Sequence, residues 1–160
     1  MTKSSFLSTL REAFDEGRDE GAHGAPTGKL VDAMMLAARS DRNVTKDELH
    51  LVANLLSKHF RAYETVSDAV VMNALHDATT RLDAMGDRDE QLKQVAAALR
   101  RRDAFAAEKG YALAYSVLLV DGGLNEREHE FADRFAEALG ILPARRLEIE
   151  QDLEAALRGP

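Results

Sequence analysis

Several residue types are scarce in this sequence of 160 residues, and each scarcity excludes a class of structure. Cysteine is absent, which excludes disulfide bonds and metal sites built from thiolates. Only 3 prolines occur, and β-branched residues never cluster in alternation, so the sequence does not favour β-strands. The longest apolar run, around Ala112 to Val120, is well short of the ~20 residues that span a bilayer.

Signatures of export, phosphate binding and zinc binding are missing as well. Arg11, Glu12 and Asp15 stand where a secretory signal peptide needs an unbroken apolar stretch. The pair Gly122-Gly123 fits neither glycine-rich phosphate-binding motif, and the 5 histidines show no HxxxH or HExxH spacing. The sequence therefore predicts a cytoplasmic protein without membrane insertion, and it does not predict an enzyme.

Charge argues against a nucleic-acid partner. The formal net charge is −7, whereas a protein that follows a phosphate backbone needs a basic stripe. The best candidate is the run Arg100 to Arg102, and positive charge there suits the solvated last turn of a helix. With 45% hydrophobic and 31% charged residues, the composition is that of a globular domain.

What the sequence does contain is apolar residues recurring at spacings of three and four, the period of amphipathic helices. Helix-starting residues and glycines separate these segments, and the short connections favour an all-α bundle of about eight helices. The predicted helices are approximately 4–20, 29–40, 46–60, one containing Val71 to Met85 that ends at Gly86, one that begins at Asp87, one from Asp103 to Val120, 126–139, and one with Pro143 in its first turn.

This pattern predicts a single domain with four parts: an N-terminal helix (1–20), a flexible linker (21–28), a core region (29–142) and a C-terminal helix (143–160). The linker is assigned because "EGAHGAPTG" is the only stretch of that composition. Several apolar and aromatic side chains are predicted to be buried, namely Met34, Met35, Tyr111, Tyr115, Ile149, Leu153, Ala156 and Leu157.

The core region contains an internal repeat. Shifted by 80 positions, "LVDAMMLAARSDRNVTKDELHLVANLLSKH" overlays "GYALAYSVLLVDGGLNEREHEFADRFAEAL" without a gap, so that Asp41 meets Asp121 and Glu48 meets Glu128. Each copy has an apolar helix, an Asp, a short turn, a capping residue and a Glu that opens the next helix. Two such units would pack as a pseudo-symmetric pair, which could bring their acidic turns together.

On "VDGGLNEREHEFADRFAEALGI" and "ARSDRNVTKDELHLVANLLSKH" the chain resembles the tellurite-resistance TerB family. The resemblance covers roughly Lys29 to Leu142, and the first copy departs from the pattern with Arg42 in the place of Gly122. It implies an all-helical fold, a divalent-cation site at the acidic turns, and a role in tellurite or chemical-stress response beside protein partners.

Two interpretations of the acidic turns follow from the residues. Thr45-x-x-Glu48 and Asn125-x-x-Glu128 both have the spacing of capping boxes, which would account for the two glutamates without a ligand. Asp41 and Asp121, in contrast, are predicted at helix C-termini, where the dipole disfavours a carboxylate. Each Asp could bond the N–H groups of the turn, or a cation could compensate its charge.

The cation hypothesis assigns Asp41, Glu48, Asp121 and Glu128 as ligands, with Asp47 and Glu126 as weaker candidates. Oxygen ligands suit Ca²⁺, Mg²⁺ or Mn²⁺. An EF-hand is excluded, because its sixth and twelfth positions would be Lys46 and Val52 instead of Gly and Glu. The alternative is a metal-independent protein–protein interaction module whose acidic turns are helix caps.

Overall fold

The computed structural model describes residues 29–40, 68–120 and 124–158. These residues form six helices and no strand, which confirms the all-α prediction for this part of the chain. The predicted linker and the predicted helices 4–20 and 46–60 lie outside the described residues. The total of about eight helices and the pseudo-symmetric repeat therefore stay predictions.

Two helices form the centre of the molecule. In α2 (Lys29–Ala38) all residues from Leu30 to Ala37 are buried. In α6 (Ala104–Val120) the burial is continuous from Gly110 to Leu118. A helix that is apolar on every side has to be covered on every side, which explains why α2 and α6 pack on each other more extensively than any other pair of the described helices.

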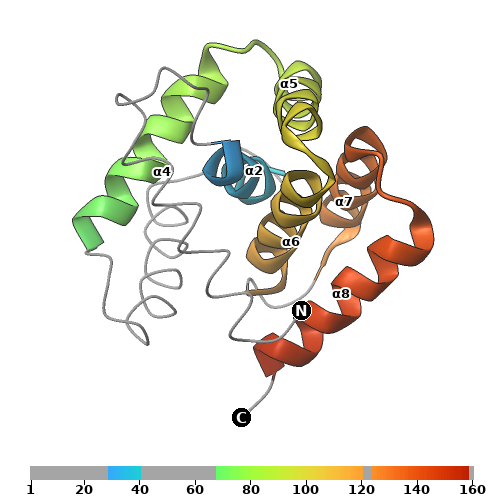
Figure 1. The fold of residues 1–160 in the computed structure, drawn as a ribbon. Helices are drawn as coiled ribbons and strands as arrows, with labels where there is room; N and C mark the ends of the chain where they lie inside the picture. The colour runs from blue at the N-terminus through green and yellow to red at the C-terminus, as the bar shows by residue number, and fades with distance from the viewer. Residues whose placement is uncertain (1–28, 41–67, 121–123, 159–160) are drawn as a thin grey trace.

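The remaining described helices cover this central pair (Figure 1). Helix α4 (Asp68–Asp83) packs on α2, while α5 (Arg88–Arg102), α7 (Glu126–Leu139) and α8 (Pro143–Arg158) pack on α6. Gly110 permits the close approach of α5 to α6, since a Cβ at this position would lie 2.5 Å from Cδ1 of Leu99. Met34, Met35, Tyr111, Ile149 and Leu153 are buried as predicted.

Local capping signals place most helix boundaries correctly. Asp87 accepts a hydrogen bond from the N–H of Glu90 (2.9 Å) and begins α5. Asp103 accepts one from Ala106 (2.7 Å) and begins α6. Gly140, with φ of 74°, ends α7 in the left-handed conformation that glycine adopts without strain.

Two helix ends differ from prediction. Helix α4 was expected to reach Gly86 but ends at Asp83, where the N–H of Met85 bonds the carbonyl oxygen of Leu82 (3.0 Å) and turns the chain before Gly86. Helix α2 ends at Ala38 rather than at Ser40, whose hydroxyl donates a hydrogen bond to the carbonyl oxygen of Ala37 (2.7 Å). A serine that bonds the backbone in this way competes with continuation of the helix.

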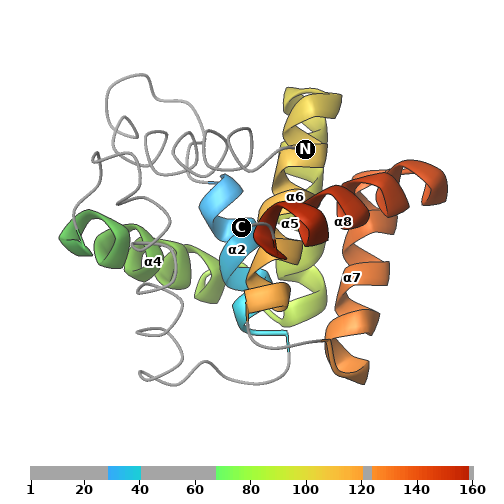
Figure 2. The same cartoon turned by 90° about the horizontal axis from the view of Figure 1, so that it is seen from below.

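The directions of four helices matter for the site. In Figure 2, α2 and α6 both end toward the lower side of the molecule, and α5 and α7 both begin there. We call this side the turn end of the bundle. No helix among the described residues is both long enough and apolar enough to cross a membrane.

Candidate functional site

Only one of the four predicted cation ligands lies within the described residues. Asp41, Glu48 and Asp121 lie outside them, as does the weaker candidate Asp47. The fourth ligand, Glu128, is buried in the first turn of α7. The arrangement of the four carboxylates therefore stays a prediction.

Glu128 closes the capping box predicted at the start of α7. Its N–H donates to Oδ1 of Asn125 (2.9 Å), and its carboxylate oxygen Oε1 accepts from the N–H of Asn125 (3.1 Å). This confirms the capping-box interpretation at Asn125. One carboxylate oxygen of Glu128 is thus occupied by the backbone, while the neighbouring Glu126 is exposed at the first position of the helix.

Replacing Asn125 by Ala should lower the free energy of unfolding by about 1 kcal/mol, because the N–H of Glu128 loses its acceptor at a helix N-terminus. For a chain of this size the melting temperature should fall by roughly 2–4 °C. Thermal unfolding followed by circular dichroism measures the change. Asn125→Ser, which keeps an acceptor, should melt close to the original chain; equal losses for both variants would contradict the capping role.

Hydrogen bonds close the end of α2. The carbonyl oxygen of Met35 accepts from the N–H of Arg39 (3.0 Å), and that of Ala37 accepts from both the N–H (3.1 Å) and the hydroxyl of Ser40. These two carbonyl oxygens therefore have protein partners at the end of the helix that precedes Asp41.

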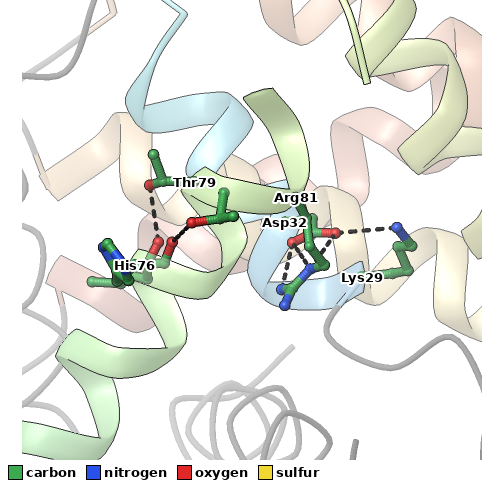
Figure 3. A network of polar contacts seen from close by, with 7 residues as sticks. Lys29, Asp32, His76, Thr79 and Arg81 are labelled. Carbon is green, nitrogen blue, oxygen red and sulfur yellow. Dashed lines mark hydrogen bonds and ion pairs between the residues drawn. The ribbon is translucent and has the colours of Figure 1, made fainter. Parts of the chain in front are cut away.

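A buried ion-pair network joins α2 to α4 (Figure 3). Asp32 is fully buried; its Oδ1 accepts from Nη2 (2.6 Å) and Nε (3.0 Å) of Arg81, and its Oδ2 lies 3.3 Å from Nζ of Lys29. Figure 3 shows the carboxylate between the guanidinium and the ammonium groups. This network was not predicted from the sequence, although an Asp inside the apolar run "KLVDAMMLAA" is a signal that the carboxylate needs a partner.

A second polar network lies between α6 and α8. The hydroxyl of Tyr111 donates to Glu150 and that of Tyr115 donates to Glu154 (3.1 Å), while Nε of Arg146 donates to Glu150 (2.7 Å). Burial, reinforced by the hydrogen bond to Glu150, raises the pKa of Tyr111 above its ordinary value. Both tyrosines are buried as predicted, but they also anchor α8 through their hydroxyls.

Arginines gather at the turn end of the bundle, and the sequence analysis missed them. They line a cavity of about 250 Å³ between the end of α2, the start of α5 and one face of α7. The only sequence signal was the spacing of Arg127 and Arg134, seven residues apart and therefore on one face of a helix. The basic run Arg100 to Arg102 does not line this cavity. It lies in the exposed last turn of α5, as the sequence predicted.

Comparison with models of known protein families, with curated proteins and with solved structures gives no match for this chain. Within residues 29–40, 68–120 and 124–158, no group of three or more His, Asp or Glu side chains is arranged to hold a metal ion. The described part of the chain offers carboxylates in ion pairs and caps, and guanidinium groups at the turn end.

Proposed function

We propose that this chain is a non-catalytic, TerB-like helical domain that binds a divalent cation through its two acidic turns. The proposal rests on the relation of α2 to α6: the two helices pack side by side, and both end at the turn end of the bundle. Asp121 follows α6 directly and Asp41 comes three residues after α2. Because both acidic residues follow helices that end on the same side of the bundle, the arrangement of α2 and α6 favours a cation bound by both turns.

The ligands in this proposal are Asp41, Glu48, Asp121 and Glu128, and the ion is Ca²⁺, Mg²⁺ or Mn²⁺. Oε1 of Glu128 already accepts the N–H of Asn125. Asp41 and Asp121 are therefore the primary ligands in this proposal, with Glu48 and Glu128 ligating or orienting. A role in tellurite or chemical-stress response, exerted beside protein partners, belongs to the same proposal through the resemblance to TerB.

The metal is tested by thermal unfolding with and without millimolar Ca²⁺, Mg²⁺ or Mn²⁺. An ion present at 100 times its dissociation constant stabilises the folded chain by about 2.7 kcal/mol, which corresponds to a rise of roughly 5–10 °C here. Asp121→Asn should abolish the rise more completely than Asp41→Asn. A melting temperature that ignores all three ions would end the cation proposal.

Glu128→Gln separates a ligand from a cap. Glutamine at this position still accepts the N–H of Asn125, so the capping box and the metal-free melting temperature should be preserved. The lost charge should nevertheless weaken cation binding. If Glu128→Gln leaves the metal-induced rise unchanged, Glu128 is a cap and nothing more.

A second candidate function, a metal-independent protein–protein interaction module, is favoured by the capping box and by the arginines at the turn end. These arginines supply positive charge beside the end of α2 without any metal. In this case partner capture by the full chain should be insensitive to a chelator, whereas the cation proposal predicts that the chelator reduces it.

A further inference from the structure

The arginine-lined cavity at the turn end is built from three separate elements. The end of α2 contributes Leu36 and Arg39, the first turns of α5 contribute Arg88 and Leu92, and α7 contributes a face that includes Phe131. Helix α5 packs on both α2 and α7, so helix packing holds the three walls together. The cavity encloses about 250 Å³, less than the volume of typical pockets for drug-sized ligands.

The charge of this cavity is opposite to that of the whole chain. Its lining has four arginines against two acidic residues, a formal excess of two positive charges in a chain whose net charge is −7. The first turn of α5 belongs to the lining, so the positive end of that helix dipole adds to the excess. The charged lining residues are Arg39, Arg88, Arg127, Arg134, Asp89 and Glu130.

Arg39 has a hydrogen-bonding atom without a partner. Its Nη2 donates to Oδ1 of Asp83 (2.6 Å), but its Nη1 is buried and has no hydrogen-bond partner among the residues that the structure describes. A buried donor left unsatisfied costs about 1–3 kcal/mol, and more when it is charged. Arg39 lines the positively charged cavity, so an acceptor bound there would have an unmet donor beside it.

The lining also has an apolar part. Leu36, Leu92 and Phe131 contribute carbon surface to the same cavity, and Phe131 is held in place by stacking on Phe135, with ring centroids 5.5 Å apart. A simple inorganic ion would leave this surface without a contact. A ligand that carries a charged head on a small apolar body would use both parts of the lining.

We propose that this cavity binds a small organic oxyanion, with a phosphate or carboxylate head on Arg39 and its neighbouring arginines and an apolar body on Phe131 and Leu92. The planar guanidinium group presents paired donors that match both kinds of head group. The size of the cavity limits the body to about one small ring or a short alkyl chain. This proposal does not rest on the cation proposal, because it uses guanidinium groups and not the carboxylates of the acidic turns.

The test is a titration of the full chain with phenyl phosphate, followed by isothermal calorimetry and by amide chemical shifts. The buffer is freed of metal by a chelating resin instead of EDTA, because EDTA is itself a polycarboxylate. We expect a dissociation constant at or below about 1 mM. Shifts should concentrate in residues 88–92 and 127–134 and be absent from 143–158.

Three variants make the test specific. Arg39→Gln should weaken binding by about tenfold or more, because the head group loses a charge-assisted donor. Asp83→Asn breaks the same ion pair with Arg39 from the other side but leaves the guanidinium in place, so binding should be retained. Arg145→Gln, an equal change of charge on α8 outside the cavity, should bind like the original chain.

Three comparison ligands show which head group binds and whether the apolar body contributes to binding. Benzoate tests the carboxylate head group, inorganic phosphate tests the head group alone, and phenol tests the ring alone. Phenyl phosphate should bind more tightly than inorganic phosphate, and phenol should not bind. Absence of binding by both phenyl phosphate and benzoate, or shifts outside the cavity, would overturn the proposal. Equal affinity of Arg39→Gln and the original chain for phenyl phosphate would also overturn the proposal. If Arg39→Gln does not fold, the chemical-shift map of the original chain decides.

Discussion

Asp32→Asn is expected to lower the free energy of unfolding by about 3–5 kcal/mol, the usual result of removing one partner from a buried ion pair. Asp32 is fully buried and accepts from both Nη2 and Nε of Arg81. The neutral amide keeps the shape of the carboxylate but removes the negative charge that the guanidinium of Arg81 and the ammonium of Lys29 both contact. The melting temperature should fall by roughly 6–20 °C.

Urea denaturation measures this loss, and two further variants locate its cause. Asp77→Asn is an equal charge change at an exposed position of α4 and should cost less than about 0.5 kcal/mol. Asp32→Leu combined with Arg81→Leu should cost much less than the sum of the single changes, because it leaves neither of the two charges buried alone. A loss for Asp32→Asn no larger than that for Asp77→Asn would show that the network contributes little to stability.

Alkaline pH is expected to destabilise the chain through Tyr111 and Tyr115. Burial and the hydrogen bond to Glu150 raise the pKa of Tyr111; burial and the negative charge of Glu150 raise the pKa of Tyr115. In the unfolded chain a tyrosine titrates near pKa 10, so above about pH 10 the unfolded state releases protons that the folded state retains. The free energy of unfolding therefore falls as pH rises, by about 1.4 kcal/mol per pH unit for each tyrosine.

The measurement compares urea denaturation of the original chain and of Tyr111→Phe between about pH 8 and pH 11.5. The variant lacks one titrating group, so its stability should fall less steeply above about pH 10 by the contribution of one tyrosine. Its stability at pH 8 serves as its own reference, which removes the effect of the lost hydrogen bond. The same slope for both proteins would mean that Tyr111 ionises alike in the folded and unfolded chains.

The two functional proposals concern the same end of the bundle but make opposite demands on charge. The cation requires the carboxylates that follow α2 and α6, and the organic anion requires the guanidinium groups that line the cavity. Titration with Mg²⁺ in the absence of organic anions, and with phenyl phosphate in the absence of metal, separates them. The Mg²⁺ titration decides only the cation proposal, and the phenyl phosphate titration decides only the anion proposal.

The sequence by itself determined the helices and many of their ends. Amphipathic spacing reflects the burial of one face, and a cap such as Asp87 or Asn125 bonds an N–H only three residues away. Both signals are local, so they are present before the chain folds. The same reasoning predicted the cap formed by Glu128, the one proposed ligand that the structure describes.

The tertiary structure alone decided which long side chains meet. Arg81 and Asp32 are 49 residues apart, and Tyr111 and Glu150 are 39 apart, yet each pair is closed by helix packing. The cavity lined by Arg39, likewise, exists only where the end of α2, the start of α5 and one face of α7 converge. A flexible charged side chain has many potential partners of opposite charge along the sequence, and its actual partner depends on the angle and offset between packed helices, which no local pattern encodes.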